Sequence, residues 1–271
     1  MANNRFKILV LSDLKKHTSI IIKSAVSLSK MINADVDLFH VKKPTDVVAS
    51  DSQLSAMRSL NQEHNKSRNK IKETIAPLNK AYNINITSNF GIGNVKSEIE
   101  DYIKATKPDV IVLGKRSSKA LKLIGDNITD FVLKTYEGPV FIAANKNGID
   151  PETELNIGLL NGKSQAFNQA FLEDVLTKTT KPLKSFNIVS SKAKVEETSV
   201  LREAVNYVFE KNDNTINKLA EYLEKNHVNL LFVNRTDSTN NSANNKSEIK
   251  SLINNVNVSL FITGSVQKWA V

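Results

Sequence analysis

The clearest pattern of hydrophobic and polar positions lies in residues 107–145. An unbroken apolar run at 109–113 is too short for a helix and rich in β-branched residues, so it predicts a strand buried on both faces. Apolar residues at helical spacing predict a helix over 127–136, with Asp126 or Asn127 as its N-cap. Gly138-Pro139 ends that helix before a second buried strand at 140–143. The stretch is therefore one parallel βαβ unit.

Ligands of parallel sheets lie outside the C-terminal ends of the strands. In this unit that place is the loop 114–127, where we expect the function to lie.

The rest of the first half continues the alternation of strands and helices. Its long polar stretch at 45–82 has no strong break before Pro77 and predicts one long helix near 51–82, while 91–94 predicts a turn. The remaining expected strands are 6–11, 35–41 and 83–90, and the remaining helices are 17–31 and 95–106.

The pattern then starts again, which indicates an internal duplication. Strands one and two repeat at an offset of about 149 residues, whereas strands three to five repeat at about 119, so the second copy lacks about 30 residues where the first carries its long helix. The second copy's expected strands are 155–160, 183–189, 204–209, 229–233 and 258–263, and its expected helices are 165–176 and 214–225.

Each copy has five expected strands that alternate with about four helices. This pattern predicts two tandem α/β domains with parallel sheets. The segment 145–154 contains Gly148, Pro151 and charged residues, as a linker does. We therefore expect domains at 1–146 and 152–271.

Composition narrows the class of protein. The chain has no cysteine, which excludes disulfides, thiolate metal sites and a cysteine nucleophile. The N-terminus lacks the shape of a signal peptide, and no apolar run approaches the roughly 20 residues that cross a bilayer. These features predict a soluble cytoplasmic protein without a membrane partner.

The net charge of +9 is unevenly distributed. Residues 1–150 hold 23 Lys and Arg against 15 Asp and Glu, which is +8, and the remainder holds 14 against 13, which is +1. A basic half can attract phosphates, nucleic acid or acidic proteins, or it is simply a solvated lysine-rich surface. No aromatic residues are interleaved with the basic ones, which argues against nucleic acid as a partner.

The chain resembles the universal stress proteins in their tandem-domain form. The resemblance rests on Ser12-Asp13 after strand one, on His40-Val41 at the end of strand two, and on the runs DVIVLGKR and ITDFVLKTYEGPVFI. It implies a five-stranded, Rossmann-like αβ sandwich of the adenine-nucleotide α-hydrolase type. Family domains pair about a pseudo-twofold through the final strand, and the tandem form would build that pair within one chain.

Members of this family that bind ATP carry Gly-x-x-Gly, nine residues, then Gly-Ser or Gly-Thr after strand four, where backbone N–H groups hold the phosphates. Here Gly114 matches the first position, Ser117 replaces the second glycine, and Asp126 and Asn127 align with Gly-Ser in a loop one residue shorter. A larger shift would give Gly125 the glycine role and leave Asp126 in the hydroxyl position. Either alignment places a carboxylate near phosphate, and like charges cost affinity.

Other candidates complete the predicted pocket. Asp13 and Val41, with the neighbouring Ser12, match positions that face the adenosine half of the ligand in family members that bind it. Asp13 alone could bind a ribose or a metal, or cap the following helix. The basic residues of the loop form an anion clamp or a solvated surface; they are Lys115, Arg116, Lys119 and Lys122.

The second copy departs further from the nucleotide-binding pattern. Its loop at 236–248 has no glycine and reads as a flexible polar linker, and Asn161 aligns with Asp13. His40 reads as a packed core histidine, and the other three histidines have no partners at ligand spacing, which predicts no metal site. No nucleophile–base motif is present in the sequence.

These observations predict a non-catalytic stress-response or regulatory module with an unidentified protein partner and a degenerate nucleotide pocket in its first domain. ATP with Mg²⁺ is the one cofactor the resemblance suggests. An alternative is a slow ATPase that uses the loop 114–127, with Asp126 as general base. A third is an interaction partner that uses the basic face. The sequence leaves open whether the intrachain pair dimerises again.

Overall fold

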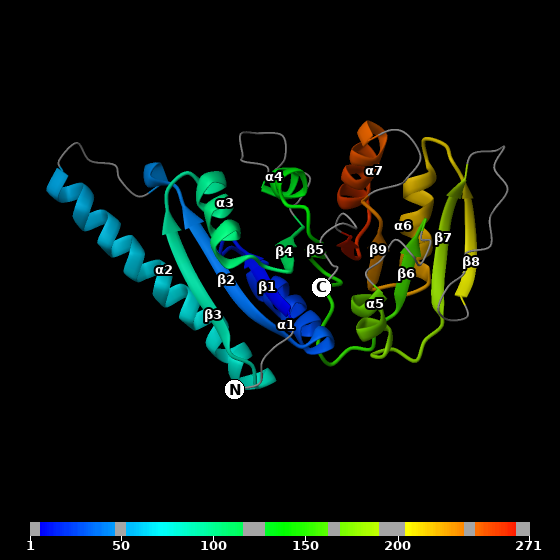
Figure 1. Ribbon diagram of the computed structural model, residues 1–271, viewed down its shortest axis with the longest axis horizontal. Helices are drawn as coiled ribbons and strands as arrows, with labels where there is room; N and C mark the ends of the chain where they lie inside the picture. Colours follow the sequence, from blue (N-terminus) through cyan, green and yellow to red (C-terminus); the bar gives the residue numbers. More distant parts are fainter. Residues whose placement is uncertain are drawn as a thin grey trace.

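The structure is a computed structural model that describes residues 6–46, 53–115, 128–161, 169–189, 204–235 and 242–263. Its strands are β1 (Phe6–Leu11), β2 (Ala34–Lys42), β3 (Ile86–Ile92), β4 (Val110–Gly114), β5 (Val140–Ala143), β6 (Ile157–Leu160), β7 (Leu183–Val189), β8 (Ala204–Glu210), β9 (Leu230–Val233) and β10 (Ser259–Ile262). Its helices are α1 (Thr18–Ile32), α2 (Gln53–Tyr82), α3 (Val95–Thr106), α4 (Ile128–Thr135), α5 (Gln169–Leu176), α6 (Thr215–Lys225) and α7 (Ser242–Asn255), with a short 3₁₀ turn at Pro44–Asp46 (Figure 1).

The strands form one continuous sheet in the order β3-β2-β1-β4-β5-β10-β9-β6-β7-β8. Neighbours are parallel except at the centre, where β5 and β10 run antiparallel with Phe141 opposite Phe261. Counted inward from either end, the strands are the third, second, first, fourth and fifth of their half, so a pseudo-twofold axis passes between β5 and β10. The expected α/β fold class and internal duplication are confirmed, and the two five-stranded sheets join into one of ten strands.

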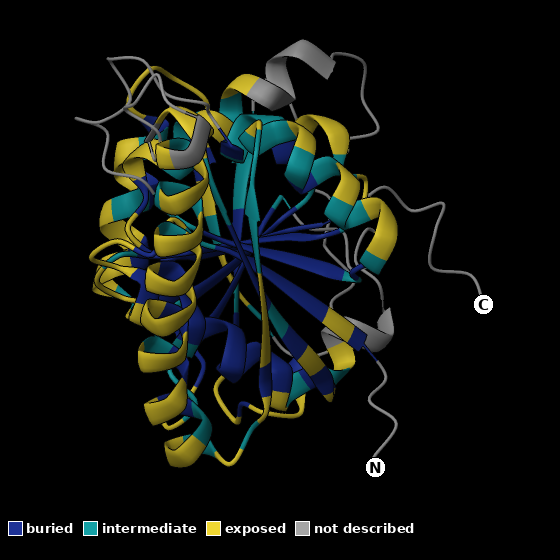
Figure 2. Ribbon diagram, turned by 90° about the vertical axis from the view of Figure 1, so that its left-hand side faces the viewer, coloured by how far each residue is buried: buried dark blue, intermediate teal, exposed yellow. Residues whose placement is uncertain are grey.

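Helices cover both faces of the sheet. Apolar residues of α1, α2 and α5 pack on one face, and those of α3, α4, α6 and α7 pack on the other. Figure 2 shows the buried strands fanned by their twist between helices with exposed outer faces. Each core is shared by both halves, since one contains Ile8 with Ile157 and the other contains Leu9 with Leu231. The two halves therefore share both hydrophobic cores, one on each face of the sheet.

Strand register refines the repeat. The pairings place Ile157 where Ile8 stands, which is the expected offset of 149 for the first strand. They place Lys184 where Asp37 stands, so the second strand repeats at 147 rather than at the expected 149. They place β9 120 residues after β4, and β8 118 residues after β3, rather than a single offset of 119. The difference arises because the connection between the third and fourth strands is two residues longer in the second half.

The long helix predicted near 51–82 is confirmed as α2, which continues through Pro77. Ile71, Ile75 and Leu78 of its C-terminal part are buried in the core, whereas Met57 near its start is 59% exposed. In Figure 1, α2 lies along the outer side of β3 and extends beyond it. Packing of the C-terminal part holds the helix despite the proline, whose cost is greatest where a helix has no tertiary support.

Three boundaries differ from the sequence-based expectation. β3 begins at Ile86 rather than at residue 83, because the main-chain and side-chain oxygens of Asn79 accept the N–H groups of Ile84 and Ile86. Gly91 and Ile92 belong to β3 and not to a turn. Residues 242–248, predicted as part of a polar linker, are the first two turns of α7.

The segment 145–154 contains no helix or strand, as a linker should, but it packs firmly against α1. Ile149 is 2% exposed, its carbonyl oxygen accepts the Ser24 hydroxyl at 3.1 Å, and Asp150 pairs with Lys23 at 3.5 Å. The connection is therefore packed onto the first half rather than extended away from it.

Candidate functional site

The C-terminal ends of adjacent strands carry the predicted pocket residues of the first half. Ser12 and Asp13 follow β1, Val41 lies near the end of β2, and Gly114 and Lys115 lie at the end of β4. β1 lies between β2 and β4, so the sheet brings these five together. The other four predicted residues lie outside the described part of the chain: Arg116, Ser117, Asp126 and Asn127.

The turn between β1 and α1 is held by its own side chains. The Ser12 hydroxyl accepts the Leu14 N–H at 3.1 Å and lies 3.1 Å from the Thr18 hydroxyl. Asp13 accepts the Lys15 N–H through Oδ1 at 3.1 Å. Asp13 therefore does not cap α1, whose N-cap position is His17 without a side-chain cap. Its carboxylate is 46% exposed, and its Oδ2 lies 3.9 Å from the exposed Lys15 ammonium, a loose surface ion pair that a ligand can replace.

His40 is a buried core histidine, as predicted, with 4% of its surface exposed. Sequence reasoning missed its contact with the pocket: its Nδ1–H donates to the Ser12 carbonyl oxygen at 2.7 Å. The other side of the ring stacks on Phe90 at 5.5 Å between centroids. Burial lowers the pKa of His40 below its ordinary value, and the charge of Lys42 acts in the same direction.

The depressed pKa of His40 predicts a loss of stability in acid. The unfolded chain takes up a proton near pH 6.5 while the folded chain resists it, so the free energy of unfolding falls as the pH drops below about 6.5. Urea denaturation at pH 7.5 and pH 5.5 measures this. The His40→Gln variant should show a smaller fall between the two pH values, and an equal fall in both proteins would contradict a role for His40.

Gly114 is required by packing. A Cβ at this position would lie 2.3 Å from Cδ1 and 2.8 Å from Cγ1 of Ile21 in α1. Such distances force a neighbour to move, so a larger residue here disturbs the fold as well as any ligand. The glycine therefore has a structural cause independent of phosphate binding.

Lys115 points toward the second half of the chain. Its main-chain N–H continues the sheet by donating to Ala143 at 2.9 Å. Its ammonium donates to the carbonyl oxygen of Val256, which follows the last residue of α7. Burial lowers the pKa of this ammonium. In the predicted anion clamp Lys115 would face the loop, but the structure uses its charge at the C-terminus of a helix, where cations are favourable.

Arg235 makes the matching contact in the opposite direction. It stands 120 residues after Lys115, at the end of β9, and donates from Nη1 to Tyr136 at 2.6 Å and from Nη2 to Gly138 at 3.1 Å. Tyr136 follows α4 as Val256 follows α7, and these two are also 120 residues apart. We call the two contacts the cross-half caps. Sequence reasoning missed Arg235, because the expected offset of about 119 aligns it with Arg116, whereas the strand register aligns it with Lys115.

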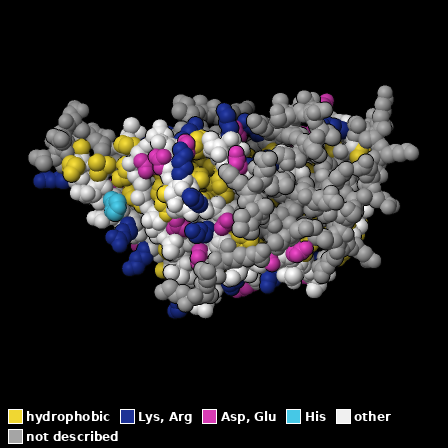
Figure 3. Space-filling model, in the orientation of Figure 1, with side chains coloured by type: hydrophobic (Ala, Val, Ile, Leu, Met, Phe, Trp, Pro, Cys, Tyr) yellow, Lys and Arg dark blue, Asp and Glu magenta, His cyan; other side chains and the backbone are white. Residues whose placement is uncertain are grey.

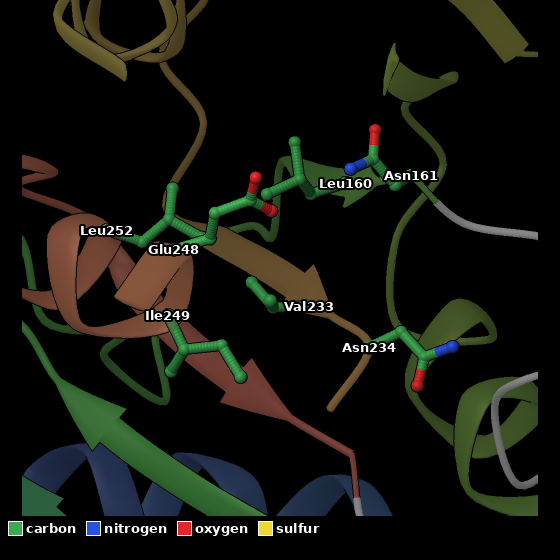
Figure 4. Close-up of a pocket in the computed structure, with 7 residues that line it drawn as sticks. All are labelled: Leu160, Asn161, Val233, Asn234, Glu248, Ile249 and Leu252. Atoms are coloured by element: carbon green, nitrogen blue, oxygen red, sulfur yellow. The ribbon is translucent and has the colours of Figure 1, made fainter. Parts of the chain in front are cut away.

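The corresponding place in the second half is nearly filled. A recess at the ends of β6 and β9 has a volume of about 30 Å³, roughly a tenth of the smallest ligand pockets. Figure 4 shows Glu248 extending from α7 toward Leu160 at its rim, and its carboxylate accepts the Lys211 ammonium. The recess is lined by Leu160, Asn161, Val233, Asn234, Glu248, Ile249 and Leu252.

The alignment of Asn161 with Asp13 was wrong by one residue. The Asn161 N–H donates to Phe186 as the Ser12 N–H donates to Phe39, so Asn161 takes the place of Ser12. Its side-chain oxygen is already occupied by the Ile188 N–H at 2.8 Å. The second half therefore lacks the exposed carboxylate that follows β1 in the first half, because Gly162 stands in the sequence where the first half has Asp13.

Among the described residues, neither the surface charge nor the metal-ligating side chains indicate a second binding site. On the face shown in Figure 3, Lys and Arg side chains are interspersed with acidic and polar groups. Within the described ranges, no three His, Asp or Glu side chains are grouped as metal ligands. No described helix is both long and apolar enough to cross a membrane.

Comparisons with known proteins agree with this geometry. The family model described as "Universal stress protein family" matches residues 4–143. The crystal structure of a universal stress protein from Archaeoglobus fulgidus DSM 4304 aligns with a TM-score of 0.66 and 16% identity over 96% of this chain and 97% of its own. A functionally unknown protein from Pseudomonas aeruginosa PAO1 aligns with a TM-score of 0.59 and 11% identity over 96% and 92%.

The search of curated proteins finds no match. At these identities the solved structures establish the fold alone, whereas the family model covers more than half of the 271 residues. The chain belongs to the universal stress protein family.

Proposed function

We propose that this chain is a non-catalytic regulatory module of the stress response, in which only the first half binds an adenine nucleotide, and binds it weakly. A protein partner would then distinguish the nucleotide-bound module from the nucleotide-free one. The observation that carries the proposal is the difference between the two halves at the C-terminal ends of their strands.

In the first half, the turn after β1 is preorganised and leaves the Asp13 carboxylate exposed, in the position that the family uses for adenosine. In the second half, Glu248 and Asn161 occupy the equivalent space. The Glu248 carboxylate is already paired with Lys211, and a recess of about 30 Å³ cannot hold a nucleotide.

Weak binding follows from two features of the first half. Lys115 is committed to Val256 and does not stand free for a phosphate. The loop sequence supplies Ser117 and Asp126 where family members that bind ATP have glycines. The loop therefore offers fewer close backbone N–H groups and one adverse charge.

The test is the Asp126→Ala variant, measured by calorimetric titration with ATP and Mg²⁺ beside analysis of nucleotide released from the denatured protein. Removing a like charge near the phosphates should raise the affinity about tenfold. Asp101→Ala, which removes an exposed carboxylate from α3, is the matched control and should leave the affinity unchanged.

Three results would overturn the proposal. Tight stoichiometric ATP binding by the unmodified protein contradicts weak affinity. Equal affinities for the protein and Asp126→Ala contradict the adverse charge. ATP hydrolysis that falls in Asp126→Ala identifies that residue as a general base and replaces the proposal with the slow ATPase.

A further inference from the structure

The two outer edges of the ten-stranded sheet differ in their protection. At the first edge, α2 lies along β3, and Asn79 of α2 accepts the outward N–H of Ile86 at 3.2 Å. His64 of α2 packs edge-on against Phe90 of β3 at 5.5 Å. The helix thus covers one outward N–H group and the Phe90 side chain of this edge, which is one way that proteins block strand pairing.

β8 forms the second edge, and among the described residues no helix lies along it, in keeping with a second half that is about 30 residues shorter at that point. The Lys211 N–H donates to Val189 of β7, so alternate residues of β8 bond inward and the others face out. The outward N–H and C=O groups belong to Ala204, Asn206, Val208 and Glu210. Within the described ranges, none of the outward N–H groups of Asn206, Val208 and Glu210 has a hydrogen-bond partner. The Glu210 carbonyl oxygen already accepts the Thr215 hydroxyl at 2.8 Å and the Asn212 amide at 3.2 Å, so the carbonyl groups left for pairing are those of the residues before it.

The side chains at this edge are apolar and exposed. Val208 is 52% exposed and Val205 46%, and Tyr222 of the adjacent helix α6 is 43% exposed. Val208 occupies the place of Phe90, which α2 covers in the first half. β8 has no proline and no lysine, and its single charge is Glu210 at its end. Strands of this kind lack the usual devices against edge-to-edge pairing.

We propose that the β8 edge binds the β8 edge of a second copy of this chain, antiparallel and centred on Tyr207. In this register all seven residues overlap, and Asn206 lies opposite Val208 of the second copy. Both residues carry outward-facing groups, so they exchange two hydrogen bonds, as an antiparallel pair requires.

Self-pairing also fits the side chains and charges. Val205 comes to lie opposite Phe209 of the second copy on one face, and Val208 lies opposite Asn206 on the other. The two Glu210 carboxylates fall at opposite ends of the paired strands, each opposite an Ala204, so like charges do not meet. The self-complementary edge favours a second copy over an unrelated strand.

The dimer should be weak. Two seven-residue edges bury less than the ~1,200 Å² of a stable standard interface, so we expect a Kd on the order of 10–100 μM. This pairing is separate from the β5–β10 contact, which is already satisfied within the chain.

Sedimentation velocity across roughly 5–500 μM tests the proposal. The mass should rise from 30.1 kDa toward about twice that value. Val208→Lys should weaken the dimer at least tenfold by placing like charges at the contact. Val208→Pro should do the same, because it removes an outward N–H that the folded monomer does not use. Met57→Lys changes an equally exposed apolar residue on α2 and should leave the dimer intact.

A cysteine scan gives an independent measurement, because the chain has no cysteine of its own. Two residues at position 207 would face each other with Cα atoms about 4.5 Å apart, within disulfide range. Tyr207→Cys should therefore form a covalent dimer on mild oxidation, whereas Met57→Cys should not. A monomer at all concentrations, or a dimer unchanged by both Val208 substitutions, would overturn the proposal even if Tyr207→Cys fails to fold.

Discussion

Replacing Phe141 by alanine is expected to lower the free energy of unfolding by about 3–5 kcal/mol, the largest effect of any substitution considered. Phe141 is fully buried at the centre of the sheet, opposite Phe261 across the antiparallel junction. It belongs to a core that contains residues of both halves. The cavity should therefore destabilise the halves together, with a single transition in urea denaturation followed by circular dichroism.

Phe141→Leu is the matched control, because it keeps most of the volume and should cost less than about 1.5 kcal/mol. Hydrogen exchange adds spatial resolution: amides of β1 and β6 should lose protection to similar extents. Two separate unfolding transitions, with only β1 through β5 affected, would show that the halves unfold independently and that the shared core is not cooperative.

Replacing Arg235 by alanine is expected to lower the free energy of unfolding by about 2–3 kcal/mol. The substitution leaves the carbonyl oxygens of Tyr136 and Gly138 without their charged donor at the end of α4. Arg235 is half-buried, which lowers the pKa of its guanidinium, and the two carbonyls replace part of the water that it loses. Urea denaturation measures the loss.

Two controls define the Arg235 contact. Arg235→Lys keeps the charge but cannot span two carbonyls, so it should recover only part of the loss. Lys115→Ala breaks the opposite cross-half cap, which involves one carbonyl, and should cost less than Arg235→Ala. A loss below about 0.5 kcal/mol in Arg235→Ala would place the contact among surface interactions of little energetic weight.

Much of the fold was predictable because several of its strands are apolar runs too short for a helix and bounded by turn residues. Strands buried on both faces, such as 110–114 and 140–143, carry a local signal in every residue. The start of β3 was misplaced because Asn79 of α2 bonds the preceding residues, a tertiary contact that the strand's own sequence does not contain. The start of α7 was missed because its first turns are polar, and Ile249 and Leu252 hold the helix from its other end.

The candidate site was predictable in position and only partly in content. Parallel strands bring Ser12, Asp13, Val41 and Gly114 to one edge, as the sequence indicates. The direction of Lys115 depends on the antiparallel junction with the other half, which no local pattern encodes. The role of Arg235 has the same origin. Asn161 was paired with Asp13 although the expected offset of 149 already pairs it with Ser12, which is where the hydrogen bonds place it.

The antiparallel junction also means that β5 is synthesised well before the strand that pairs with it. The sheet partner of β5 is β10, and 119 residues separate the end of one strand from the end of the other. At ~5–20 residues per second, the edge of β5 waits on the order of 6–24 s on the ribosome before its partner emerges. During that interval, neighbouring nascent chains on one messenger RNA expose identical unpaired β5 edges. The β10 strand of each chain, which is made later, must then displace any strand of another chain that has paired with β5.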